Sequence, residues 1–150
     1  MLFPQLKIEG YAPKSPPEPY YNCIAWATGD TDRYWSPIPR DRGSAGDAGP
    51  CGDYWPLGVA QENTADAWMA ALAKVGFEAC PSEEVEPGLE KIAIYTDGHG
   101  EPTHVARQLP NGCWTSKLGD ECDLEHNTLK ALEGKQYGTA CHFMKRQAKR

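Results

Sequence analysis

Apolar residues recur with two different periods along the chain, a helical one in its middle and a strand-like one after it. Between Thr64 and Val75 the apolar residues fall on one side of a helix, which Thr64 can cap and Gly76 can close. After residue 90 the apolar positions alternate with polar ones, which is the period of a half-buried strand. We therefore expect strands at 91–95, 103–109, 113–118 and 139–144.

Short connections between these strands predict their arrangement. A glycine-rich loop at 97–102 joins the first two strands, and a Pro-Asn-Gly turn at 110–112 joins the second to the third. Such short turns connect neighbouring antiparallel strands, because parallel strands need a long crossover. The three strands are therefore expected to form an antiparallel meander.

Two further helices are expected before and after these elements. Asn22 can cap a short helix that carries Cys23 in its first turn and ends at Gly29. A later helix is expected from Asp123, as its cap, to Leu132. With 150 residues the chain can form one domain with its own core, and we predict an α+β fold whose first helix packs on an antiparallel sheet.

The remaining segments are rich in proline or glycine. Residues 1–19 hold five prolines and are expected to form an extended arm over the domain. Residues 36–60 form a long loop with Tyr54 and Trp55 as an apolar anchor, and loops of this length commonly border an active site. Residues 80–88 are acidic and broken by two prolines, which indicates a surface connection.

Charge and hydropathy exclude two classes of partner. The net charge is −6, and basic residues gather only near the C-terminus, so phosphate backbones are unsuitable partners and nucleic acid is not expected. No apolar run approaches the roughly 20 residues that span a bilayer, so we expect a soluble protein with no membrane partner.

Six cysteines raise the question of redox compartment. The first residues lack a basic segment followed by an apolar run, so no signal peptide is visible. We therefore expect reduced thiols and a cytoplasmic location, while export without a signal stays open. Zinc is a rival use of these residues, but no Cys-x-x-Cys pair is present and the spacing of Cys113, Cys122 and His126 is irregular. Neither a metal nor a cofactor is expected.

Cys23 is the first candidate for chemistry, because the start of a helix offers unpaired backbone N–H groups and the positive end of the helix dipole. Both favour the thiolate, which is the nucleophilic form. A thiol nucleophile also needs a base that later protonates the leaving group, and histidine suits both steps. Among the four histidines, only His104 stands at the start of an expected strand, where its side chain could face the start of the helix.

These elements in this order resemble the papain-like fold in its compact bacterial form, the NlpC/P60 and CHAP cysteine peptidases and amidases. The resemblance covers about residues 20–118 and implies Cys23 as nucleophile and His104 as base, with a polar orienting residue on the next strand. Those peptidases usually carry Asp at the position of Asn22, and their third-strand residue has no equivalent in 114–118. More narrowly, Asn-Cys-Ile-Ala-Trp-Ala at 22–27 and Trp-Thr-Ser-Lys-Leu-Gly at 114–119 look like an uncharacterised bacterial family.

The third catalytic residue is predicted from strand geometry. A loop of three residues after the His104 strand places Ser116 on the same face as His104, whereas two or four residues would place Thr115 and Lys117 there. The turn at 110–112 favours three, so we choose Ser116, with His126 or Asp120 as alternatives. The backbone N–H of Cys23 is the natural oxyanion donor, and the Asn22 side chain is a second one if it is not used for capping.

The sequence thus predicts a cysteine peptidase or amidase that cleaves a peptide or isopeptide-type amide. We favour a peptide or protein substrate over a peptidoglycan stem peptide, because peptidoglycan lies outside the cytoplasm. Two alternatives stay open. The same Cys-His pair would serve an acyltransferase of transglutaminase type, and a non-catalytic module would bind peptide or glycan through the aromatic residues Trp35, Tyr54 and Trp55.

Overall fold

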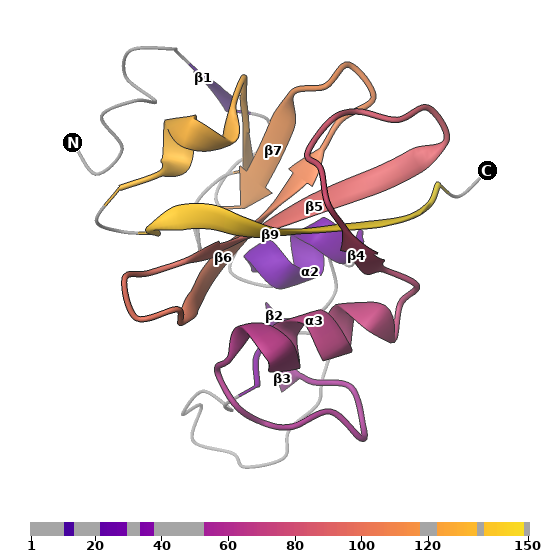
Figure 1. Cartoon of the computed structure of the whole chain (residues 1–150), viewed down its shortest axis with the longest axis vertical. Helices are drawn as coiled ribbons and strands as arrows, with labels where there is room; N and C mark the ends of the chain where they lie inside the picture. Colours follow the sequence, from indigo (N-terminus) through magenta and orange to yellow (C-terminus); the bar gives the residue numbers. More distant parts are fainter. Residues whose placement is uncertain are drawn as a thin grey trace.

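A computed structural model describes residues 11–13, 22–29, 34–37, 53–117, 123–134 and 137–148. Within these ranges a seven-stranded antiparallel sheet has the strand order β1-β8-β7-β6-β5-β9-β4 (Figure 1). Its strands are β1 (Tyr11–Pro13), β4 (Glu78–Cys80), β5 (Leu89–Thr96), β6 (Pro102–Gln108), β7 (Trp114–Lys117), β8 (Asp123–His126) and β9 (Thr139–Gln147). The fold is α+β, as expected, and strands β5, β6 and β7 form the expected antiparallel meander.

Two α-helices lie on one face of the sheet, α2 (Cys23–Thr28) and α3 (Ala65–Ala73) (Figure 1). Both begin at the expected cap, because the side chain of Asn22 accepts from Ala25 N at 3.2 Å and that of Thr64 from Ala67 N at 3.1 Å. They fall short of the length and apolarity that a membrane-spanning helix needs, and no other α-helix is described.

The sheet is buried on both faces, so the described residues contain two apolar cores. The first lies between the sheet and the two α-helices and includes Ile94 and Val105, and the second lies on the opposite face and includes Tyr95 and Ala106. A short 3-10 helix, η1 (Leu129–Leu132), covers this second face. Alternation along β5 and β6 therefore decides which core each side chain joins.

The predicted helix at 123–132 is wrong. Asp123–His126 is instead strand β8, which pairs with β7 on one side and β1 on the other, and only Leu129–Leu132 is helical. A run of ten residues is too short to form a helix by propensity alone. Pairing with two neighbouring strands satisfies the backbone, and the register places His126 opposite Trp114 on the second face.

Several strands have no clear signal in the sequence. β1 lies within the expected proline-rich arm and pairs with β8, and β4 ends at Cys80, where the expected 80–88 connection begins, and pairs with β9. Two short parallel strands, β2 (Tyr34–Trp35) and β3 (Asp53–Tyr54), join the ends of the expected long loop. Residues 38–52 of that loop lie outside the described residues.

Candidate active site

Cys23 begins α2, and the side chain of Asn22 fixes this point of the chain. The Asn22 amide oxygen accepts from both Ala25 N and Trp35 N, and its Nδ2 donates to Trp35 O at 2.6 Å. Asn22 is therefore occupied with capping α2 and with holding β2 against the start of that helix. The sequence indicated the cap but not the two bonds to Trp35.

The Cys23 thiol is buried against Val105 of β6, and 8% of the residue is exposed. Burial raises the pKa of Cys23 to about 11, although backbone N–H groups of Val105, Ile24 and Cys23 itself act in the opposite direction. The loss of solvation therefore raises the pKa of Cys23 by more than the backbone N–H groups at the start of the helix lower it. The sequence predicted a thiolate here, whereas the buried side chain is a thiol at neutral pH.

His104 leaves β6 on the other face of the sheet. It pairs with Tyr95 of β5, while its neighbour Val105 pairs with Ile94, and only Val105 and Ile94 belong to the core beneath α2. The imidazole stacks on the Tyr137 ring with centroids 4.2 Å apart and planes within 3° of parallel. The alternation therefore directs the His104 ring to the face of the second core, although the residue also borders the pocket at the start of α2.

Tyr137 is held against His104 by its neighbours in the chain and in space. Thr103 donates a hydrogen bond to Tyr137 O. Gly138 follows with a φ of +80°, and a Cβ on this residue would lie 1.9 Å from Thr96 O, so only glycine fits. No signal in the sequence assigned Tyr137 to the site.

Neither ring nitrogen of His104 has a hydrogen-bond partner among the described residues, although the residue is only 1% exposed. Buried polar atoms without partners cost free energy and are therefore rare in folded proteins. Where one is retained, a functional role is one explanation. The pKa of His104 is lowered well below its ordinary value, first by burial and then by repulsion whenever His126 is protonated. The ring is therefore neutral at pH 7, the state that accepts a proton.

Cys23 and His104 nevertheless border one pocket of about 360 Å³. It lies at the starts of α2 and β6, and Trp68 of α3 and Tyr137 contribute aromatic walls. None of its lining residues is Asp, Glu, Lys or Arg. They are Asn22, Cys23, Ile24, Trp35, Ser36, Pro37, Asn63, Trp68, Pro102, Thr103, His104 and Tyr137.

Ser116 lies on the same face as His104, as predicted from a three-residue turn. Leu109 N donates to Cys113 O at 2.7 Å, which leaves residues 110–112 as the loop, and Arg107 pairs with Thr115. One step along this register, Ser116 lies opposite Ala106, two residues from His104. The geometric argument for the face of Ser116 is therefore confirmed.

The partner of Ser116 is His126 rather than His104. Ser116 Oγ lies 2.9 Å from His126 Nε2, and His126 Nδ1 lies 2.8 Å from Thr128 O. A carbonyl only accepts, so Nδ1 of a neutral His126 carries the proton and Nε2 accepts from the Ser116 hydroxyl. Both residues are buried, and neither lines the pocket of Cys23.

The other candidates occupy different places. His99 is exposed in the β5–β6 loop, His142 lies within β9, and Asp120 lies outside the described residues. Trp35 is 1% exposed and packs edge-on against Tyr54, so it belongs to the core more than to a rim. Nowhere in the described ranges do three or more His, Cys, Asp or Glu side chains gather as metal ligands would.

Comparisons with known proteins add one finding. Neither the comparison with curated proteins nor the comparison with solved structures gives a match. Residues 13–145, which include Cys23, His104 and Ser116, match the model of a family described as a domain of unknown function. The chain therefore belongs to the family DUF7689.

Proposed function

We propose that this chain is a cysteine hydrolase of papain-like type that cleaves a peptide or isopeptide-type amide. The proposal is supported by one observation above the others, a buried imidazole without hydrogen-bond partners that shares a pocket with a cysteine at the start of a helix. In it, Cys23 is the nucleophile and His104 is the general base and then the general acid. Ser116 is a positioning residue that is bonded to His126, whose electrostatic interaction lowers the pKa of His104.

The resting pair is a neutral thiol and a neutral imidazole, because burial raises the pKa of Cys23 and lowers the pKa of His104. The thiol proton therefore moves only as Cys23 Sγ bonds to the substrate carbonyl carbon. Since Cys23 lies on the helix side of the sheet and His104 on the opposite side, this proton passes through the shared pocket, with a water molecule between Sγ and the imidazole.

The later steps return every group to its starting state. His104 gives its proton to the leaving nitrogen as the C–N bond breaks, which leaves a thioester on Cys23. His104 then takes a proton from a water molecule whose oxygen bonds to the thioester carbon. The C–S bond breaks, the carboxylic acid leaves, and the proton returns to Cys23.

The start of α2 supplies the groups that stabilise the developing oxyanion. The backbone N–H groups of Cys23, Ile24 and Val105 lie around Sγ, where they lower the pKa of the thiol. The same groups favour negative charge on an oxygen beside Sγ during attack. Asn22 takes no part in this, because its amide is bonded to Trp35 and to Ala25.

The lining of the pocket points to a class of substrate. Its described residues form aromatic and small polar walls and include no Asp, Glu, Lys or Arg, although the chain as a whole carries a net charge of −6. A charged group would enter such a pocket without a counter-ion, at a high desolvation cost. We therefore propose an amide whose nearest substituents are uncharged, in a peptide or protein more than in peptidoglycan.

A second candidate is a non-catalytic module that binds the same kind of peptide. It is favoured by the absence of a hydrogen bond between Cys23 and His104 and by the protonated state of the thiol at neutral pH. A binding module would need only the shape of the pocket.

The deciding experiment compares the native protein with Cys23→Ala and His104→Ala, and with Cys141→Ala as a matched control at an exposed thiol. Each is incubated with a diverse peptide library and with purified peptidoglycan, and products are read by mass spectrometry. We expect peptide cleavage by the native protein and by Cys141→Ala only.

Other outcomes separate the alternatives. Muropeptide release with an untouched library would overturn the substrate preference. Incorporation of an added amine in place of hydrolysis would assign an acyltransferase. Binding of library peptides by all four proteins without any product would support the non-catalytic module.

A further inference from the structure

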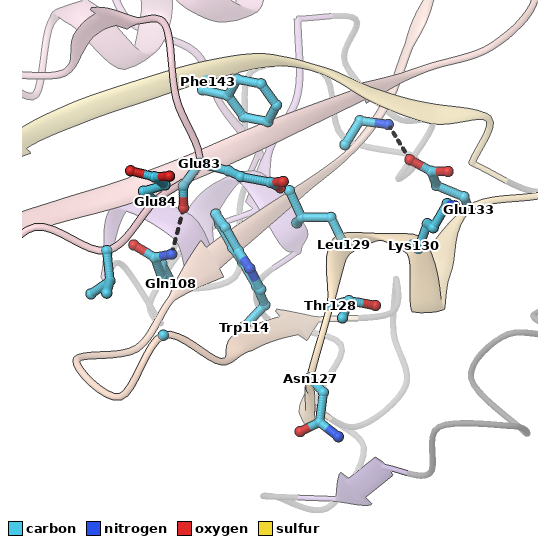
Figure 2. A pocket seen from close by; sticks show the side chains of 13 residues that line it. Glu83, Glu84, Gln108, Trp114, Asn127, Thr128, Leu129, Lys130, Glu133 and Phe143 are labelled. Atoms are coloured by element: carbon cyan, nitrogen blue, oxygen red, sulfur yellow. Dashed lines mark hydrogen bonds between the residues drawn. The ribbon is translucent and has the colours of Figure 1, made fainter.

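A second pocket of about 550 Å³ lies on the face of the sheet opposite α2 and α3 (Figure 2). Its walls come from three parts of the chain, namely the segment after β4, the β6–β7 hairpin, and η1 with the start of β9. It shares no lining residue with the pocket of Cys23. Any ligand here is therefore bound away from the proposed nucleophile.

The outer wall, the segment 82–86, is attached firmly to the sheet. Gln108 Nε2 donates to Glu83 O at 2.8 Å, as Figure 2 shows. The buried Lys91 donates to Ser82 O at 3.2 Å and forms an ion pair with Glu86 at 3.1 Å. These contacts come from two different strands, so they preserve the pocket in the absence of a ligand.

The floor of the pocket is apolar. Trp114, Leu129 and Phe143 belong to or pack against the second core, and Val85 at the edge remains 46% exposed. Figure 2 shows Leu129 on η1 near the Glu83 side chain, with Phe143 on β9 and Trp114 on β7 beside them. Such a surface suits an aliphatic chain several carbons long.

Carboxylates stand on two opposite walls above this floor. Glu83 and Glu84 come from the segment after β4, Glu133 follows η1, and Lys130 is the one cationic side chain among the lining residues. Within the described chain, Glu83 and Glu84 form no ion pair, and Glu133 accepts only from Ala140 N at 3.3 Å. Their charge reaches the interior, because Glu133 and Glu83 add to burial in raising the pKa of Tyr95.

We propose that this pocket binds a lysine or arginine side chain of a peptide, flanked by apolar residues. Both side chains join an aliphatic stem to a cationic head, so the stem would lie on the Trp114 floor while the head reaches the carboxylates. Three carboxylates against one ammonium group give the pocket the opposite charge to its ligand. This inference goes beyond the proposed hydrolase and does not depend on it.

The test is a titration of the native, ¹⁵N-labelled chain with capped tripeptides, read at the indole N–H resonance of Trp114. The probes are acetyl-Leu-Lys-Leu-amide, its arginine form, its glutamate form and its norleucine form, which keeps the stem and removes the charge. We expect the lysine and arginine peptides to bind at least about tenfold more tightly than the norleucine peptide. Mass spectrometry confirms that each peptide stays intact during the titration.

A paired set of variants locates the interaction. Glu83→Gln with Glu133→Gln keeps the shapes and the acceptor for Ala140 N, and we expect a loss of about tenfold in affinity for the lysine peptide. Glu62→Gln with Glu78→Gln makes the same change of net charge at exposed positions outside the pocket, and should leave the affinity within about twofold. Equal binding of lysine and norleucine peptides, equal loss in both variants, or shifts confined to the Cys23 pocket would overturn the proposal.

Discussion

Buried polar groups on the two faces of the central sheet differ in whether they have hydrogen-bond partners. On the helix face, Asn22 makes three hydrogen bonds and the Trp26 indole donates to Thr115 at 3.0 Å. On the opposite face, the Ser116 and His126 side chains are bonded, but His104 has two buried nitrogens without partners. The polar groups of the first face therefore stabilise the fold through their hydrogen bonds, whereas the buried nitrogens of His104 on the second face do not.

The two residues of the proposed pair also differ in their surroundings. Cys23 is surrounded by backbone N–H groups and apolar residues, whereas His104 is stacked among aromatic rings. Each side chain is held in its neutral form by burial. A site assembled from the two faces needs the pocket at the starts of α2 and β6, which both side chains border. The following experiments test whether each face behaves as its contacts require.

The largest expected effect is on the reactivity of Cys23. A pKa raised from 9.0 to about 11 lowers the thiolate fraction at pH 7 to 8 by about a hundredfold, and burial further limits access. We therefore expect iodoacetamide to alkylate Cys141, which is exposed, far faster than Cys23 in the native chain. Mass spectrometry of each cysteine across pH 6 to 10 measures both rates.

Denatured protein is the control, since all thiols should then react at similar rates. Fast labelling of Cys23 near pH 6 in the native chain would restore the thiolate that the sequence predicted. It would also show that the thiol and the imidazole form an ion pair at rest, against the neutral pair proposed above.

The next effect is the loss of the Asn22 bonds. Asn22→Ala removes the cap of α2 and the two bonds that the Asn22 side chain makes to the backbone N–H and C=O of the buried Trp35. We expect the free energy of unfolding to fall by about 3 kcal/mol. Urea denaturation measures it, and Asn111→Ala, which removes one bond in an exposed turn, should cost less than about 1 kcal/mol. A similarly small loss for Asn22→Ala would mean that the two hydrogen bonds from Asn22 to Trp35 contribute little to the free energy of unfolding.

Local signals were sufficient for much of the fold. Asn22 and Thr64 predicted where two helices begin, because capping depends on neighbouring residues alone. The turn at 110–112 predicted the register that places Ser116 with His104, since loop length and strand alternation are also local. Candidate residues on one strand or one hairpin were therefore placed correctly with respect to one another.

The relation between elements was harder to predict. Alternation shows that His104 and Val105 face opposite sides, but only the packing of α2 decides which side faces Cys23. The prediction of a helix at 123–126 is wrong because the strand form also depends on pairing with β1, which lies far away in the sequence. Tyr137 likewise meets His104 only through the path of the chain around Gly138.

A smaller effect is expected for the bonded pair on the second face. Ser116→Ala leaves His126 Nε2 without its partner while His126 Nδ1 keeps its bond to Thr128 O. We expect a loss of about 1 to 2 kcal/mol in the free energy of unfolding. Thr139→Ala, an exposed hydroxyl on β9, serves as a control and should cost less. A positioning role for Ser116 also predicts a shifted pH profile of any Cys23-dependent activity, which a purely structural role would not produce.

The smallest effect on stability at neutral pH is expected for His104, and its sign is the informative part. His104→Phe removes two buried nitrogens that have no partners and keeps a ring to stack on Tyr137, so the free energy of unfolding should stay unchanged or rise by about 1 kcal/mol at pH 7.5.

The same substitution should matter more in acid. The pKa of His104 is lowered in the folded chain, so below about pH 6.5 the unfolded chain binds a proton that the folded chain does not, and the native protein loses stability as the pH falls. The Phe variant lacks this group, so its advantage should grow between pH 7 and pH 5. Urea denaturation at several pH values measures the difference, with His99→Phe, at an exposed position, as the control. A variant less stable than the native protein at pH 7.5 would mean that the imidazole is bonded in solution, and the resting site would then be built differently from the one described.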